Sequence, residues 1–474
     1  MRILPRAASA AVCAFLFLFT VNNSIAQPVH RPNAITRTSI ASADWQLPTT
    51  WDTGVVPGVG DNVIIATGTM VTMPSDTTIG GGIVTVRSGA ILDLKSASLT
   101  ASKLIAENGS EVIQRLGNSP RSTILTYQLA SDSTYSFIGN TTTLSDTQPI
   151  YGNLRIKPSA NSNGMVATTL TVLGNFIVDF QSGYELGLQS GSSTFGGLIV
   201  QKGTLVLNRS SGTATLNVAG DIEIRSAGTL RGTNSSGHAT LNLGGNLINN
   251  GTFQQDDGSS SGIFTVDLNG TAEQHISGLN AIAFENLTVN NATGVVLDRD
   301  VSVDKTLTLT LGRVKTGDFT LLTGSGSTIA GAGENSYVEG YIAKEFSSNG
   351  SFAFPVGTDS GYSPVTATIT ALPTNPSKLS VAAFNGAGPG VDAANSVTRF
   401  WNIIEEGDLT ANLTFSYRDE DVTTPAAEAN YSLVKKDGNA LPVVVCTGAG
   451  CINAAANTAS AGGVTGFSRW AIGA

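Results

Sequence analysis

The sequence predicts an all-β chain, a single-stranded parallel β-helix followed by a carboxy-terminal β-sandwich. The first observation is a repeated phrase of alternating apolar and polar residues. Leu216-Asn-Val-Ala-Gly-Asp returns 25 residues later as Leu241-Asn-Leu-Gly-Gly-Asn, and a related phrase begins at Leu170, 46 residues before Leu216 and close to two periods away. A period in the low twenties built from short alternating strands is typical of a solenoid in which each period forms one coil.

The second observation is an interleaved phrase, Gly-Thr-Leu or Gly-Thr-Phe, which begins at Gly203, Gly228 and Gly251 with spacings of 25 and 23 residues. One coil needs three strands of about five residues and short corners, which together give this period. Glycine, asparagine and aspartate suit the corners because they tolerate positive φ. A leucine-rich repeat has a similar period, but its helical return segments are missing. Over residues 45–335 we expect roughly 12 coils.

Within each coil, alternation predicts which side chains face inward. Leu216 and Leu241 should point into the core, and Asn217 and Asn242 should point outward. A single coil cannot bury its apolar face alone, so consecutive coils must stack. We therefore expect one elongated core, with threonine, serine and asparagine displayed outside.

The first 26 residues predict a secretory signal peptide. Arg2 and Arg6 provide the charged start, an apolar run covers residues 7–21, and Ser24-Ile-Ala26 offers a small-residue cleavage site before Gln27. The apolar run is shorter than the roughly 20 residues of a membrane span, which favours a cleaved signal over an anchor. We expect a secreted or cell-surface product without a membrane span in its mature part, and a flexible lead-in over residues 27–42.

Composition fits an extracellular protein. Charged residues make up 13% of the chain, about half of ordinary usage, and the formal net charge is −9. An acidic chain without basic clusters argues against nucleic acid and anionic membranes as partners.

The cysteines predict one local disulfide. Cys13 lies in the signal, which leaves Cys446 and Cys451 in Cys-Thr-Gly-Ala-Gly-Cys. In an oxidising compartment such a pair favours a disulfide. A redox or metal role would need companions, and the three histidines are scattered: His30, His238 and His275.

The beginning of the predicted solenoid carries a pattern of tryptophan, glycine, proline and aspartate, made by Trp45, Trp51, Gly54, Pro57, Gly60 and Asp61. Over residues 43–115 the chain resembles the glycine-rich extracellular module named for its eight conserved glycines. The resemblance implies a β-helix start and contacts with carbohydrates or surfaces, and it brings no catalytic residue. Trp45 and Trp51 are interpreted as a plug over the open end of the first coil, with a sugar-stacking platform as the alternative.

The composition changes after a glycine-rich stretch at residues 324–333, so the predicted boundaries are 43–335 for the β-helix and 336–474 for the second domain. Short strands and turns continue to the end of the chain. Phe354-Pro-Val-Gly, Phe400-Trp-Asn-Ile and Phe467-Ser-Arg-Trp make this region similar to the β-sandwich that follows solenoids in bacterial surface and secreted proteins. The resemblance implies such a sandwich here.

An enzyme of the pectin lyase or galacturonan hydrolase kind is the main alternative function, because such enzymes also use β-helices. Asp256 and Asp257 are the candidate carboxylate pair for general acid and base work. Companion motifs are absent, since His238 lies in Gly-His-Ala and Arg155-Ile-Lys precedes the aspartates. The neighbouring polar residues favour a solvated loop for this pair.

Two runs of acidic residues are candidate sites for a Ca²⁺ ion. Asp298 and Asp300 fall on one face of a predicted strand with Asp304 nearby, and Asp419-Glu-Asp421 is the second run. Carboxylates at this spacing are also common on ordinary surfaces, so no cofactor is expected. We therefore expect an exported, non-enzymatic surface or matrix protein, adhesin-like or structural, contacting glycans or cell surfaces. The alternatives are a polysaccharide lyase or hydrolase, and a rod that only spaces the terminal domain from the envelope.

Overall fold

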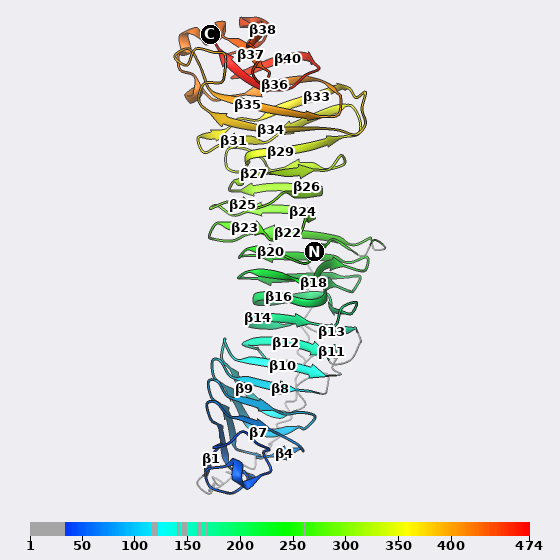
Figure 1. The fold of residues 1–474 in the computed structure, drawn as a ribbon, viewed down its shortest axis with the longest axis vertical. Coiled ribbons are helices and arrows are strands. Elements are labelled where there is room, and N and C mark those ends of the chain that lie inside the picture. Colours follow the sequence, from blue (N-terminus) through cyan, green and yellow to red (C-terminus); the bar gives the residue numbers. More distant parts are fainter. Residues whose placement is uncertain are drawn as a thin grey trace, which may run out of the picture.

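The computed structural model describes residues 34–115, 122–139, 143–144, 149–158, 163–166, 169–256, 258 and 261–474. The predicted signal peptide, with Cys13, and His30 in the lead-in lie outside these residues. The chain forms a long rod of stacked β coils with an antiparallel domain at its carboxy-terminal end (Figure 1). The parallel β-solenoid has about 14 turns. The expected 12 is too low because the coils begin before residue 45, continue beyond 335 and shorten in places.

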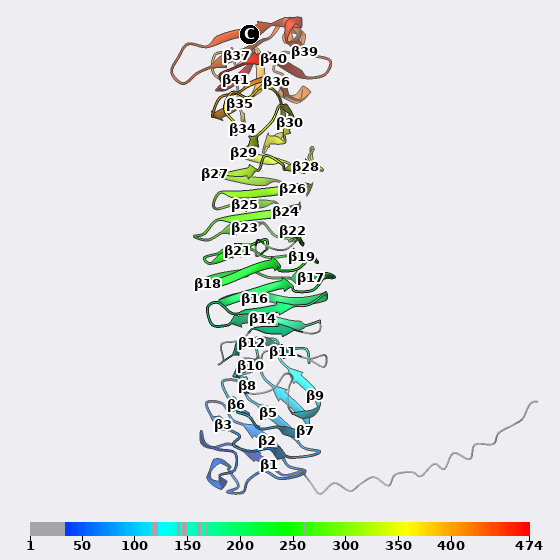
Figure 2. The ribbon, with the colours of Figure 1, turned by 90° about the vertical axis from the view of Figure 1, so that its right-hand side faces the viewer.

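The amino-terminal coils contribute one short parallel sheet and the start of a second (Figure 2). The first sheet contains β1 (Thr36–Thr38), β2 (Asn62–Ile65), β5 (Ile83–Val86), β7 (Leu99–Ala106) and β9 (Thr123–Leu129), with β4 (Thr77–Thr78) beside β7. The second starts with β3 (Met70–Thr72), β6 (Ile91–Asp93), β8 (Glu111–Gln114), β10 (Thr134–Gly139), β12 (Asn153–Pro158) and β14 (Thr171–Asp179).

The central coils contain the longest strands, which continue around a corner of the coil. These are β16 (Gly191–Asn208) and β18 (Ile222–Thr233). One wall then continues through β17 (Thr213–Val218), β19 (His238–Leu243), β22 (Ile263–Leu268), β24 (Ile282–Asn290), β26 (Val301–Leu311) and β28 (Thr328–Ala330). Another continues through β20 (Leu247–Asn249), β23 (Gln274–Ser277), β25 (Val295–Leu297), β27 (Val314–Thr323), β29 (Val338–Phe346) and β31 (Val356–Thr358). Short strands complete other corners: β11 (Thr143–Leu144), β13 (Gly164–Val166), β15 (Glu185–Leu188) and β21 (Thr252–Gln254).

The sequence repeat corresponds directly to neighbouring coils. Leu216 pairs with Leu241, and Gly203 pairs with Gly228, in parallel register. The inward leucines are buried, whereas the side chain of Asn242 donates to Asn217 Oδ1 of the preceding coil at 2.8 Å. The predicted direction of both kinds of side chain is therefore confirmed.

The carboxy-terminal domain is a sandwich of two antiparallel layers. One layer contains β29, β34 (Ser377–Asn385), β35 (Ser396–Glu406), β41 (Arg469–Gly473), β37 (Ser432–Lys436) and β38 (Val443–Thr447). The other contains β30 (Gly350–Phe354), β33 (Val365–Ala371), β36 (Thr410–Ser416), β40 (Thr458–Val464) and β39 (Ile452–Asn453). Between the layers, the ring of Phe415 lies 5.1 Å from Trp401 and 5.3 Å from Trp470.

The two parts share strand β29. It pairs in parallel with β27 and β31 of the last coils and antiparallel with β34 of the sandwich. Parallel pairing thus continues beyond the predicted boundary at 335/336. Among the described residues, no helix has the length and apolar character needed to cross a membrane.

Candidate functional site

The two amino-terminal tryptophans lie inside the first coils. Trp45 is 0% exposed and Trp51 is 1% exposed, and their rings meet edge to face with centroids 5.0 Å apart. Trp51 Nε1 donates to the carbonyl oxygen of Trp45 at 2.8 Å. Buried indoles cover apolar interior and leave no ring face for a sugar, so this geometry corresponds to a plug and not to a stacking platform.

The predicted catalytic pair is only half described. Asp256 is partly exposed, and its Oδ1 accepts a hydrogen bond from the Gly258 amide at 2.7 Å, as in a surface turn. Asp257 lies outside the described residues.

The candidate Ca²⁺ ligands each have a partner of another kind. Asp298 contacts His275 Nδ1 at 2.9 Å, Asp300 accepts from the Thr320 amide at 2.8 Å, and Asp304 accepts from Gln255. In the second run, Asp419 accepts from Asn457 and Asp421 pairs with Arg399. Among the described residues, no group of three or more histidine, cysteine, aspartate or glutamate side chains is placed to hold a metal ion.

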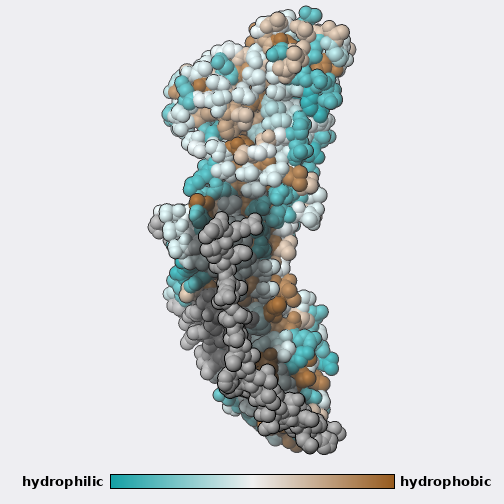
Figure 3. All heavy atoms as spheres, turned by 180° about the vertical axis from the view of Figure 1, so that it is seen from behind, coloured by the Kyte–Doolittle hydropathy of each residue, from teal (hydrophilic) through white to brown (hydrophobic). Residues whose placement is uncertain are grey.

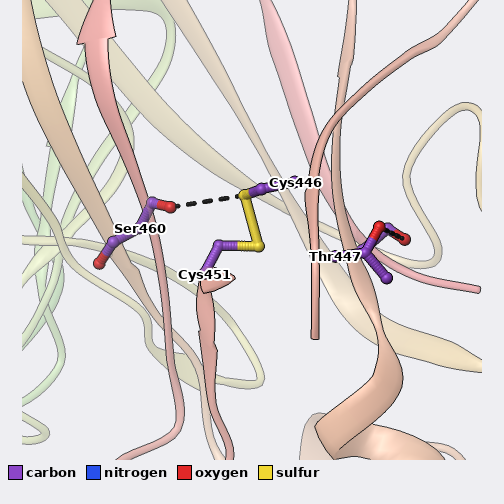
Figure 4. The surroundings of a disulfide bond; sticks show 5 residues. Cys446, Thr447, Cys451 and Ser460 are labelled. Carbon is purple, nitrogen blue, oxygen red and sulfur yellow. Dashed lines mark hydrogen bonds between the residues drawn. A yellow bond between two sulfur atoms is a disulfide. The ribbon is translucent and has the colours of Figure 1, made fainter. Parts of the chain in front are cut away.

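The predicted disulfide between Cys446 and Cys451 is confirmed (Figure 4). Their Cα atoms are 6.0 Å apart. The bond joins the end of β38 to the residue after the short 3-10 helix Gly448–Gly450. It therefore ties the hairpin of β37 and β38 to the start of β39.

A hollow of about 450 Å³ lies where the last coils meet the sandwich, and we call it the junction hollow. Its walls come from β27, β29, the end of β31 and β34. The ionisable, amide and aromatic side chains around it are those of Lys315, Glu339, Asp359, Phe384 and Asn385. A larger hollow of about 670 Å³ near Val59 and Ile83 has no ionisable or aromatic side chain among its described lining residues. The junction hollow is thus the better candidate for a specific ligand.

A buried guanidinium orders the polar side of the junction hollow. Arg399 is 0% exposed, and its Nη1 donates to Asn385 Oδ1 at 3.0 Å and to Thr358 Oγ1. Because its oxygen is held by Arg399, Asn385 turns its Nδ2 toward Asp359 and donates to Oδ1 at 2.5 Å. This hydrogen bond, with a second from Ser360, holds the pKa of Asp359 below its usual value. The junction hollow therefore presents an exposed, ionised carboxylate that is hydrogen-bonded to Asn385.

Aromatic side chains line the adjoining outer face of the sheet. Phe384 on β34 and Phe400 on β35 are cross-strand partners, stacked with centroids 5.2 Å apart and an interplanar angle of 17°. Tyr341 on β29 meets Phe384 edge to face at 6.2 Å, and its hydroxyl accepts from Asn402 Nδ2 at 2.7 Å. All three rings are partly exposed, so they form an apolar strip beside the polar wall.

Ion pairs occupy the basic and acidic groups on the solenoid side of the junction hollow. Lys315 Nζ lies 2.5 Å from Glu273 Oε2. Arg313 Nη1 lies 2.9 Å from Glu339 Oε2, an ion pair without good hydrogen-bond geometry. Together with the fixed amide and carboxylate, this wall can donate to and accept from hydroxyl groups, while the ring of Phe384 can contact C–H groups.

Sequence reasoning did not find this site. Its residues come from the last coils and from β34, and they meet only because β34 returns antiparallel against β29. The one available signal was Phe384-Asn385, an aromatic and an amide at the end of a strand.

No protein-family model matches the chain, and neither the curated proteins nor the solved structures include a match to it.

Proposed function

We propose that this chain is an exported, adhesin-like rod that binds glycans at the junction hollow. The observation that carries the proposal is a partly exposed ring, Phe384, beside an amide that a buried arginine holds and a carboxylate that this amide holds in turn. Sugars offer hydroxyl groups to the polar wall and an apolar C–H face to the ring. Because the amide and the carboxylate are already hydrogen-bonded, binding has fewer side-chain rotamers to order.

The charge state of the junction hollow supports binding over hydrolysis. A glycosidase needs one carboxyl group whose pKa is raised so that it can donate a proton. The pKa of Asp359 is lowered instead, and Glu339 is engaged with Arg313. Neither arrangement favours a general acid.

Export is part of the proposal and rests on the leader sequence. The Cys446–Cys451 disulfide supports it, because disulfides persist in oxidising compartments. We also propose that residues 43–115 form the eight-glycine module, whose first coils the buried tryptophans close. Amino-terminal sequencing of protein recovered from the medium or cell surface should begin at Gln27, and retention of Met1 would contradict export with cleavage.

A glycan array tests the binding proposal directly. The chain from Gln27 onward should bind a subset of glycans, and Phe384→Ala should weaken that binding at least about fivefold, as expected for a central contact worth over about 1 kcal/mol. Asp256→Asn, a change at a distant surface turn, is the matched control and should bind like the parent. Equal binding by Phe384→Ala and the parent would refute the site.

Polysaccharide turnover measured on the same samples separates the alternative. Turnover that disappears in Asp257→Asn would establish an enzyme and overturn the binding proposal.

A further inference from the structure

The hairpin of β37 and β38 leaves a strand edge open. In the described part of the chain, β38 pairs with β37 and with no other strand, so one row of its backbone amides and carbonyls has no sheet partner. Figure 1 places it at the carboxy-terminal tip, at the opposite end of the rod from β1. Open edges pair with other strands unless something blocks them.

The side chains at this edge are apolar and exposed. Val443, Val444 and Val445 are 58%, 60% and 41% exposed, and Leu441 just before them is 86% exposed. Valine favours extended backbone and packs well against valine across strands. The space-filling view shows tan and brown atoms among teal ones at this tip (Figure 3).

Strand β38 and the chain that follows it carry no charge over a long stretch. Residues 439–468 contain no aspartate, glutamate, lysine or arginine, although the chain has a net charge of −9. Two copies of an acidic protein repel each other over most of their surfaces. The neighbouring strand β37 carries Lys435 and Lys436, and Lys435 pairs with Asp437 at 3.2 Å. On β38 itself, two copies can pair without placing like charges opposite each other.

We propose that β38 pairs antiparallel with β38 of a second copy, which joins two rods tip to tip. A partner for this edge must itself offer an open, uncharged strand edge, and the same strand in another copy does so. A two-fold axis through Val444 places Val443 of one copy opposite Val445 of the other, so apolar side chains meet across the axis. The resulting pair presents two junction hollows, which would strengthen binding to a surface that carries many ligands.

Two features limit the strength of the pair. Pro442 precedes the strand, and the register between β37 and β38 is irregular at Leu433/Val434, so the open edge is only five residues long. Such an edge buries less than the roughly 800 Å² per partner of a standard interface, which predicts a reversible dimer with a dissociation constant in the micromolar range or weaker.

Sedimentation velocity on the chain from Gln27 onward, with its disulfide intact, tests the proposal. Between low micromolar and several hundred micromolar concentration, the weight-average mass of the parent should rise toward twice that of one chain. Val444→Lys places a charge at the centre of the pair and should stay at the mass of one chain. The matched control, Leu279→Lys, alters a side chain that is 84% exposed on the side of the rod and should associate like the parent.

A second measurement locates the contact. Amide hydrogen exchange in residues 443–447 should slow as the parent's concentration rises and should not change with concentration in Val444→Lys. A parent that keeps the mass of one chain throughout, or a Val444→Lys variant that associates as the parent does, would overturn the proposal. Neither result bears on glycan binding at the junction hollow.

Discussion

Replacing Asp421 by asparagine tests the buried network beneath the junction hollow. Asp421 Oδ1 lies 2.9 Å from Nη2 of Arg399, with side chains 5% and 0% exposed. Asparagine keeps the size of the side chain and removes its charge, which leaves the guanidinium buried without a counter-ion. Breaking a buried pair in this way costs about 3–5 kcal/mol. Arg399 keeps its hydrogen bonds to Asn385 and Thr358, so we expect a loss of about 3 kcal/mol.

The loss is measured where it arises, by hydrogen exchange mass spectrometry of β35 peptides over a urea series. Asp437→Asn is the control, because Asp437 is 57% exposed and pairs with Lys435 at the surface, where an ion pair contributes less than about 1 kcal/mol. If Asp421→Asn lowers the free energy of unfolding no more than Asp437→Asn does, Arg399 does not depend on Asp421 and our account of the network fails.

Two further predictions concern other carboxylates. Asp267 occupies on the next coil the position that Asn217 and Asn242 hold on the two coils before it. Its Oδ1 is buried without a hydrogen-bond partner, and burial raises its pKa. The folded chain therefore binds the proton more tightly than the unfolded chain, and ionisation of Asp267 lowers the stability of the fold above that pKa. Asp267→Asn should add a third asparagine to the row of Asn217 and Asn242. It should raise the free energy of unfolding at pH 7 by about 1 kcal/mol and make that free energy fall less as the pH rises, as measured by urea titration. A less stable variant would contradict this prediction. The lowered pKa of Asp359 keeps its ionised form until the pH falls through that value, so glycan binding measured by calorimetry should be constant from pH 8 to about 5 and decrease only below about pH 4. A decrease centred near pH 6 would show that another group controls binding.

The repeat made the solenoid predictable because each coil restates the same side-chain pattern. Leu216 and Leu241, 25 residues apart in the chain, are direct neighbours across coils. The boundary was harder to predict, since the glycine-rich stretch at residues 324–333 looks like an end while parallel pairing continues to β31. The glycine-rich stretch marks a loop between two strands, and the strands on either side of a loop can still pair with neighbouring coils.

The candidate site could not be predicted from residue types. Acidic residues such as Asp298 and Asp300 stand out in the sequence, yet each has a partner from the preceding or following coil. The junction hollow depends instead on Asn385 reaching both Arg399 and Asp359. These contacts join three separate segments, and no local spacing encodes them.

Strand β29 also has a mechanical consequence. It belongs to the last coils and to the sandwich at once, so no flexible linker separates the two parts. A torque applied at the carboxy-terminal tip therefore turns the whole solenoid. Tension along the solenoid acts parallel to the backbone hydrogen bonds between strands, because those bonds join one coil to the next. Such a load separates the coils one after another, so the rod would lengthen in small steps under shear flow and not unfold in a single event.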